Sequence, residues 1–254
     1  MRNWLVALVV LAVCCSVVPP GFTQEEEGLL SKSGFEVSGD LAICTQYVWR
    51  GILLDRDMVM QPGFYITSPE SKLGRIKAGV WSSQDVQNRD NLHSQELDYI
   101  FDYTYAFEKF SLSAGHTYYD FPDSDLQSRE FYTGVSLSAV PLSPSLYFYY
   151  DYGDESDGGG DGSYTVLNLS HSIPIKNTAF TLDLGGHIGY NHGLFMRGNG
   201  GDVGLKAGLT IPLTKNLSFG PSVNYAIPFA DLRDKGDGAQ KNRFFASFGF
   251  SYVF

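Results

Sequence analysis

The chain is poor in cysteine, and beyond its first residues it has no apolar run long enough to form a membrane-spanning helix. Only three cysteines occur in 254 residues, and two of them, Cys14 and Cys15, stand inside the apolar N-terminal run. After Val18 the apolar residues stay in short groups, which excludes a helical membrane protein. Cys44 is then left alone, so no intramolecular disulfide can stabilise an exported domain.

Basic residues are also in the minority. The chain has 18 Lys and Arg against 28 Asp and Glu, which gives a formal net charge of −10 at pH 7. An acidic chain is repelled by phosphate backbones and by anionic lipid surfaces. We therefore expect no nucleic-acid partner.

The N-terminus has the layout of a secretory signal peptide. Arg2 precedes an apolar run from Trp4 to Val18 that is too short to span a bilayer, and a small-x-small site ends at Thr23. Loss of Arg2 on cleavage would change the formal charge from −10 to −11. The expected organisation is a signal peptide at 1–23, an acidic lead at 24–33 and one domain at 34–254.

Apolar and polar residues alternate through the rest of the chain. In the clearest segment Tyr99, Phe101 and Tyr103 share one face, while Asp98 and Asp102 share the other. A helix would instead gather its apolar residues three and four positions apart. Twelve segments show this pattern, an even number as single-chain bacterial barrels require. The expected strands cover 35–50, 58–67, 73–82, 96–107, 110–120, 129–140, 145–152, 163–173, 178–190, 202–211, 217–227 and 243–254.

The connections between these segments alternate in length. A short connection follows every second strand, and a long polar connection follows most of the others. Outer-membrane barrels show this asymmetry because their tight turns face the periplasm and their longer loops face outside. A soluble barrel or sandwich has no reason to sort its loops in this way. The connection at 51–57 is the exception, because it should be an outer loop and is short.

The C-terminal segment is apolar on one face only. Phe250, Tyr252 and Phe254 stand on one face, and Gly249 and Ser251 stand on the other. One face suits hydrocarbon and the other a polar interior. The segment resembles the closing strand of bacterial outer-membrane barrels. That resemblance implies that Phe250, Tyr252 and Phe254 form the assembly signal read by the barrel-assembly machinery.

These patterns predict an all-β protein, a 12-stranded antiparallel transmembrane β-barrel. A chain without a helical span can cross hydrocarbon only as a closed barrel, because closure pairs every backbone group. The expected location is the bacterial outer membrane, with lipid around the wall. The expected function is passive diffusion of ions or small solutes, with no cofactor and no metal. The alternative is a closed barrel with a structural or surface-binding role and no pore.

A short motif at the end of the first expected strand carries a family resemblance. Tyr47, Trp49, Arg50 and Gly51 form a Tyr-x-Trp-Arg-Gly signature. It resembles that of the TorF-type porins, outer-membrane proteins with largely undefined substrates, and implies an outer-membrane pore. Strand alternation would place Tyr47 and Trp49 on the lipid face and Arg50 inside, near the outer mouth. Arg50 then either lines a constriction or pairs with a carboxylate of the wall.

Strand parity also identifies charged side chains that would line the lumen. Acidic residues dominate on two strands, with Glu36 and Asp40 on the first and three acids on the fourth, which favours a weak preference for cations. The same mixture of charges could instead form salt bridges that fill the lumen, because twelve strands are intermediate in width. The expected pore-lining residues are Glu36, Asp40, Arg50, Lys77, Glu96, Asp98, Asp102, Asp183, Lys206 and Arg243, with Arg75, Asp151 and His187 also at inward positions.

Two alternatives to a pore are a calcium-binding loop and an enzymatic site. The segment 151–161 offers carboxylates to calcium, but its acids are not at the alternating positions of an EF-hand loop, so we interpret it as a solvated outer loop. An enzymatic barrel would need a serine and a histidine together. No Gly-x-Ser-x-Gly motif accompanies the candidates, and we expect no enzymatic activity. The histidines considered are His116, His171, His187 and His192.

Overall fold

A computed structural model describes residues 33–87, 95–154, 156, 158–196, 198–234 and 238–254. The expected signal peptide at 1–23, and all but the last residue of the lead at 24–33, lie outside these residues. In the described part of the chain, no helix is both long and apolar enough to cross a membrane. The elements are β1 Glu36–Cys44, β2 Tyr47–Trp49, β3 Ile52–Asp55, β4 Val59–Thr67, β5 Arg75–Asp85, β6 Glu96–Ala106, β7 Ser111–Phe121, β8 Leu126–Ser136, β9 Ser145–Asp151, β10 Ser163–Pro174, β11 Thr181–His192, β12 Asn199–Pro212, β13 Leu217–Ala230, α3 Asp231–Asp234 and β14 Arg243–Val253.

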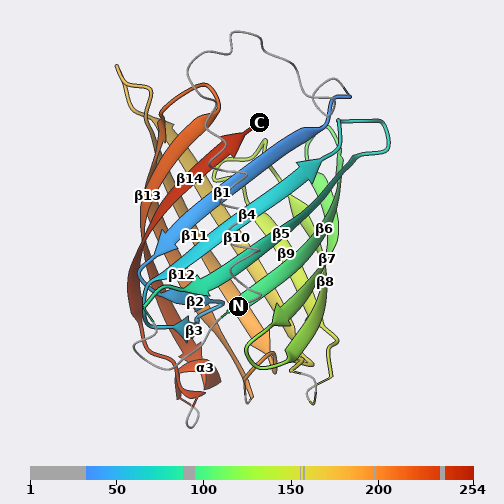
Figure 1. The fold of residues 1–254 in the computed structure, drawn as a ribbon, viewed down its shortest axis with the longest axis vertical. Coiled ribbons are helices and arrows are strands. Elements are labelled where there is room, and N and C mark those ends of the chain that lie inside the picture. The colour runs from blue at the N-terminus through green and yellow to red at the C-terminus, as the bar shows by residue number, and fades with distance from the viewer. Residues whose placement is uncertain (1–32, 88–94, 155, 157, 197, 235–237) are drawn as a thin grey trace.

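Twelve of these strands close into an antiparallel barrel (Figure 1). β1 pairs with β4 on one side and with β14 on the other, so that Gly39 stands opposite both Phe64 and Tyr252. Closure leaves no free sheet edge and pairs the backbone groups of every wall strand. The predicted 12-stranded antiparallel barrel is therefore confirmed.

The wall presents large apolar side chains outward and polar or small side chains inward. Phe101 on β6 and Ile188 on β11 are 48% and 52% exposed on the outer face. Asp98 and Glu130, at inward positions of β6 and β8, are 7% and 2% exposed. An apolar surface that continues around a whole barrel suits hydrocarbon rather than water.

The two ends of the barrel differ in their connections. The turn end, at the top of Figure 1, carries the connections 68–74, 107–110, 137–144, 175–180 and 213–216. The loop end carries 45–58, 86–95, 122–125, 152–162, 193–198 and 231–242. The contrast in length is weaker than expected, because some strands run further toward the loop end. β8 begins at Leu126 and β11 extends to His192, which shortens the loops beside them.

The first barrel strand also ends earlier than expected. The alternation over 35–50 predicts one long strand, but β1 ends at Cys44 and the chain bends at Thr45. Thr45 still contacts β14, because its backbone N–H donates to the carbonyl of Ala246 at 2.9 Å. The chain then leaves the wall and forms a separate antiparallel hairpin from β2 and β3.

The hairpin turn places Arg50 in an unfavourable backbone conformation. Arg50 and Gly51 link β2 to β3 with φ angles of 48° and 76°. Two positive φ angles are typical of a tight type I′ hairpin turn, which glycine adopts without strain. A left-handed arginine costs on the order of 1 kcal/mol, so contacts of its side chain must offset this cost.

Candidate functional site

The β2–β3 hairpin lies across the interior of the barrel at the loop end. The Tyr47 hydroxyl donates to Oε2 of Glu96 on β6 at 2.9 Å, and the Tyr47 ring lies 5.9 Å from that of Trp81 on β5. At the turn of the hairpin, a Cβ atom on Gly51 would lie only 2.6 Å from Cβ of Asp202 on β12. Because β6 and β12 stand on opposite sides of the closed barrel, the hairpin spans its width.

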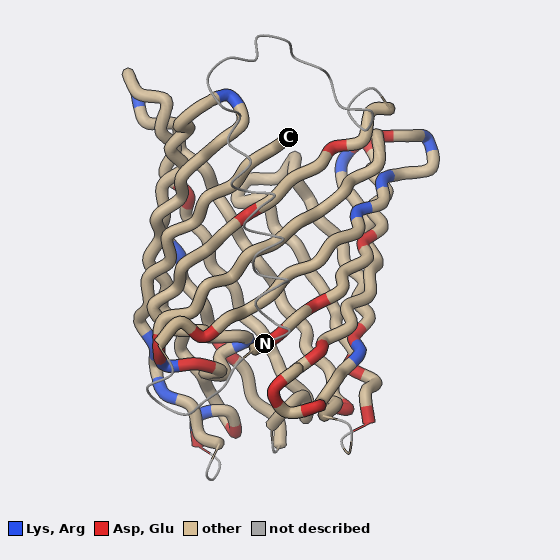
Figure 2. Tube along the Cα trace, viewed as in Figure 1, with Lys and Arg blue, Asp and Glu red and all other residues tan. Residues whose placement is uncertain are grey.

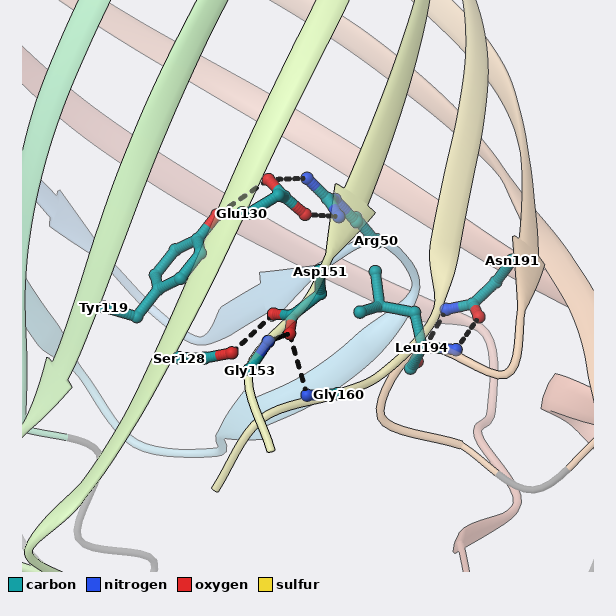
Figure 3. A network of polar contacts seen from close by, with 9 residues as sticks. All are labelled: Arg50, Tyr119, Ser128, Glu130, Asp151, Gly153, Gly160, Asn191 and Leu194. Atoms are coloured by element: carbon teal, nitrogen blue, oxygen red, sulfur yellow. Dashed lines mark hydrogen bonds and ion pairs between the residues drawn. The ribbon is translucent and has the colours of Figure 1, made fainter. Parts of the chain in front are cut away.

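Arg50 ties the hairpin to the wall through a bidentate ion pair with Glu130 on β8 (Figure 3). Nη1 lies 2.6 Å from Oε2 and Nη2 lies 2.8 Å from Oε1. Tyr119 on β7 donates its hydroxyl to Oε1 of the same carboxylate at 3.0 Å. The Arg50 and Glu130 side chains are 10% and 2% exposed, so water screens the pair little. We call Arg50, Glu130 and Tyr119 the hairpin latch.

Aromatic rings enclose the Arg50 guanidinium. It lies 4.3 Å from the ring centres of Trp49 and Tyr149, and 4.8 Å from that of Tyr164. Burial opposes the charge on Arg50, but the Glu130 carboxylate outweighs burial and raises the pKa of Arg50. Arg50 is therefore charged, and ion pairing and cation–π contacts hold it in place.

The lipid-facing positions predicted for Tyr47 and Trp49 are wrong. Both side chains lie inside the barrel, where the Trp49 ring is 6.5 Å from that of Tyr119 and 5.8 Å from that of Phe195. The parity argument fails because it continues the alternation of β1 past the bend at Thr45. Arg50 lies inside the loop end, and there it pairs with a carboxylate.

A second polar group surrounds Asp202 on β12. The Tyr164 hydroxyl donates to Oδ1 at 2.8 Å, and Nε2 of His187 lies 2.8 Å from Oδ2. The Asp202 side chain is 1% exposed. These contacts give a buried carboxylate the partners that it needs. Asp202 also lies directly beside the turn of the hairpin, at Gly51.

Acidic residues gather toward the loop end of the barrel (Figure 2). Glu96, Glu130, Asp151 and Asp202 are at most 5% exposed, and each accepts a hydrogen bond from a hydroxyl group. The sequence analysis placed Tyr47 on the lipid face and did not identify the tyrosines that face inward near this end. Strand alternation could have identified these tyrosines, because each stands on the polar face of its strand. The inward tyrosines near this end are Tyr119, Tyr149 and Tyr164.

The other residues predicted to line the pore face the lumen but do not form one cluster. Lys77 Nζ lies 2.8 Å from Oδ2 of Asp102. Asp183 accepts hydrogen bonds from Ser172 at 2.6 Å and Thr210 at 2.7 Å. A pore-lining role stays a prediction for Lys77, Asp102 and Asp183. It also stays a prediction for the other expected pore-lining residues that form no ion pair in the described part of the chain, Glu36, Asp40, Asp98, Lys206 and Arg243.

The inner surface is bulky on one side and small on the other. The ring of Tyr132 on β8 fills the space beside Gly115 on β7, where a Cβ atom would meet it. On the opposite side, the nearest atom to a Cβ on Gly185 would be Cβ of Lys206 at 3.7 Å, and Gly249 has no ring against it. The open part of the lumen therefore lies along β11 to β14.

Two cavities border the hairpin. The outer aromatic pocket, of about 170 Å³, lies at the loop end and is lined by Trp49, Ile52, Leu54, Glu96, Tyr119, Phe121 and Phe195. The inner chamber, of about 340 Å³, is bounded by Val48, Arg50 and Gly51 and reaches the middle of strands β10 to β14. Residues of the hairpin line both cavities, so the hairpin lies between them.

Asp151, predicted to line the lumen, instead anchors the loop at 152–162 (Figure 3). Its Oδ2 accepts a hydrogen bond from the Ser128 hydroxyl at 2.6 Å. Its Oδ1 accepts from the backbone N–H groups of Gly153 at 2.9 Å and Gly160 at 3.1 Å. The Asp151 side chain is fully buried, so the loop closes over its own anchor.

Replacing Asp151 with Ala is expected to loosen this loop and leave the barrel closed. A buried hydrogen bond to a charged group contributes about 1.5–3 kcal/mol, so the loss of three should expose the loop at least about tenfold more often. The measurement is the rate at which a broad-specificity protease cuts the folded protein within 152–162. Asp154→Ala is the control, because the hydrogen bonds of the Asp154 side chain among the described residues stay within the loop, on Ser156. Equal cutting of both variants and the parent would contradict the anchor.

Two of the histidines considered for catalysis, His116 and His187, form hydrogen bonds within the wall. His116 stands on the outward face, with Nε2 2.8 Å from the Tyr152 hydroxyl, and His187 contacts Asp202. Within the described residues, no group of three His, Cys, Asp or Glu side chains could hold a metal ion. Cys44 is buried at the end of β1, where its Sγ lies 3.3 Å from Oε1 of Gln61.

Three solved structures with a similar fold are described as porins or as an outer-membrane channel. The KdgM porin, solved with disordered oligogalacturonate, superposes with a TM-score of 0.53 at 14% identity over 85% of this chain and 99% of that chain. The NanC porin gives 0.52 at 9% identity over 84% and 98%. An outer-membrane channel from Pseudomonas putida F1 gives 0.53 at 8% identity over 86% and 95%. At these identities the likeness shows a shared fold.

By sequence, no protein of curated function matches the chain. A bacterial family does match, over residues 29–226. The matched span includes the hairpin and all three residues of the latch. Because it also covers most of the barrel, the chain belongs to the Gcw_chp family, described as bacterial protein of unknown function.

Proposed function

We propose that this protein is a channel of the bacterial outer membrane through which ions or small solutes diffuse passively. The observation that carries the proposal is the inner chamber of about 340 Å³, whose lining includes Lys206, Asn168 and Asn224, within a closed, outwardly apolar barrel. A narrower barrel would fill its interior with side chains, whereas this lumen is open along β11 to β14. Passive selection by width and charge needs no cofactor.

The likenesses to other proteins support this proposal. The fold is that of the KdgM and NanC porins, and the Tyr-x-Trp-Arg-Gly motif resembles that of the TorF-type porins. In the same proposal, residues 1–23 direct export and are then removed. The outward aromatic residues Phe250, Tyr252 and Phe254 are recognised by the barrel-assembly machinery.

The hairpin narrows the loop-end mouth of this channel. It crosses the barrel from β6 to β12, and Trp49, Arg50 and Gly51 stand within the path. In this proposal Arg50 has both of its predicted roles. Its ion pair with Glu130 fixes the hairpin in the path, and the hairpin forms the constriction.

We expect the refolded chain, from residue 24 onward, to produce discrete single-channel currents in a planar bilayer. The current steps should grow with salt concentration, because a polar lumen conducts hydrated ions. A matched variant, in which residues 46–57 are replaced by a short Gly-Ser link, should give larger steps. Silence of both folded proteins would contradict the channel.

The second candidate function is a closed barrel with a structural or surface-binding role. The observation that favours it is the hairpin, which lies across the mouth with its ion pair almost fully buried. The same recordings separate the two candidates. A closed barrel predicts that the parent is silent and that only the shortened variant conducts.

A further inference from the structure

Lys206 is a charged group of the inner chamber that the fold does not use. It lies near the middle of β12, exposed to the lumen, opposite Gly185 on β11 and Asn224 on β13. Gly185 has no side chain, and the space beside the lysine is therefore open. Among the described residues, Lys206 enters no ion pair.

The carboxylates on the same wall are held by other groups. Asp202 is buried and contacts Tyr164 and His187. Asp183 directs one oxygen to the Ser172 hydroxyl and the other to the Thr210 hydroxyl. Asp183 attracts the Lys206 ammonium, but neither carboxylate forms an ion pair with it in the described part of the chain. The ammonium therefore remains available to a negatively charged group that enters the chamber.

Lys206 is the cation of the chamber lining that forms no ion pair among the described residues. Arg50 is already paired with Glu130, and Asp202, the one carboxylate of the described lining, is buried against Tyr164 and His187. In a cavity bounded by protein, an ammonium without an ion-pair partner attracts an anion. The acids that predict a weak cation preference stand on other strands, β1 and β6.

Neutral hydrogen-bonding groups surround Lys206. Asn168 and Ser170 on β10 and Asn224 on β13 line the same chamber. The contacts that these amides make within the wall are long, 3.5 Å from Asn168 to Ser145 and 3.3 Å from Asn224 to Ser222. Among the described residues, little of their hydrogen-bonding capacity is used, and amide and hydroxyl groups of this kind suit the hydroxyls of a solute.

We propose that the inner chamber binds a small hydroxylated anion, with Lys206 on its negative group and Asn168, Ser170 and Asn224 on its hydroxyls. This inference rests on the proposed channel function, in which the chamber lies on the path of the solute. Its volume of about 340 Å³ is at the lower end of the range for small-molecule sites. Val48 and Phe245 supply apolar contact for the carbon chain.

Three probes that share a six-carbon polyol chain test this assignment. Gluconate is negative, sorbitol is neutral and N-methylglucamine is positive. Calorimetry on the detergent-solubilised protein is expected to show gluconate binding at least about tenfold more tightly than either of the others. Lys206→Gln should remove that advantage, and Lys206→Arg should keep most of it. Lys215→Gln, which removes a lysine from the turn at 213–216, is the charge-matched control and should bind as the parent does.

Two results would overturn the assignment. Sorbitol or N-methylglucamine binding as tightly as gluconate would mean that the chamber does not recognise negative charge. Gluconate binding unchanged by Lys206→Gln would place the site elsewhere. Because calorimetry needs no current, a barrel that binds gluconate through Lys206 but never conducts would contradict the channel alone. A barrel that conducts but shows no preference for gluconate would contradict the anion-binding proposal for the inner chamber and leave the channel standing.

Discussion

Replacing Glu130 with Gln is expected to raise the conductance of the proposed channel, because it releases the hairpin from the mouth. The change leaves Arg50 charged and buried without its carboxylate, beside a backbone that is already strained at a φ of 48°. Removing one partner of a buried ion pair costs about 3–5 kcal/mol, and each 1.4 kcal/mol is tenfold, so displaced hairpins become about a hundredfold to several thousandfold more frequent. Single-channel recording should show a wider current level that is rare or absent in the parent.

Two further variants make this test specific to the latch. Tyr119→Phe removes one hydrogen bond to the Glu130 carboxylate, which contributes about 1.5–3 kcal/mol, and keeps the ion pair, so its effect should be about tenfold to a hundredfold and smaller than that of Glu130→Gln. The double variant Arg50→Gln, Glu130→Gln leaves no buried unpaired charge and should lie closer to the parent than Glu130→Gln alone. If Glu130→Gln folds and its current levels match those of the parent, the latch does not control the mouth.

The architecture of the wall could be predicted from the sequence because the pleat of a strand fixes which residues share a face. Tyr99 and Phe101 face outward, and Asp98 and Asp102 face inward, as their alternation indicates. The inward placement of Lys206 follows from the same rule. A period of two needs no long-range information, and it therefore survives errors of several residues in the strand bounds.

The hairpin could not be predicted in this way. A strand in the wall and a hairpin packed inside the lumen can show the same alternation, and only the bend at Thr45 separates them. The latch joins residues 80 positions apart, Arg50 and Glu130, and no local pattern records such a contact. The chamber likewise depends on register, which brings Asn224 opposite Lys206 across the β12–β13 pair.

Replacing Val223 with Arg is expected to destabilise the barrel in lipid, because Val223 faces outward near the middle of β13. Its side chain is 44% exposed, and it stands between Ala207 and Ala246 of the neighbouring strands. An arginine on the lipid face of a barrel near the bilayer midplane costs about 2–4 kcal/mol. Denaturant titration of the protein refolded in lipid vesicles should show the free energy of unfolding reduced by about that amount.

Ser222→Arg is the matched control, one residue away and on the inward face. Ser222 stands opposite Gly208 and Ser247, so the lumen has room for the longer side chain and water to solvate its charge. We expect a loss of about 1 kcal/mol or less for this variant. Because the two changes add the same charge at nearly the same depth, only the face of the wall distinguishes them. Equal losses would mean that the outward face does not contact hydrocarbon, and the outer-membrane location would fail with it.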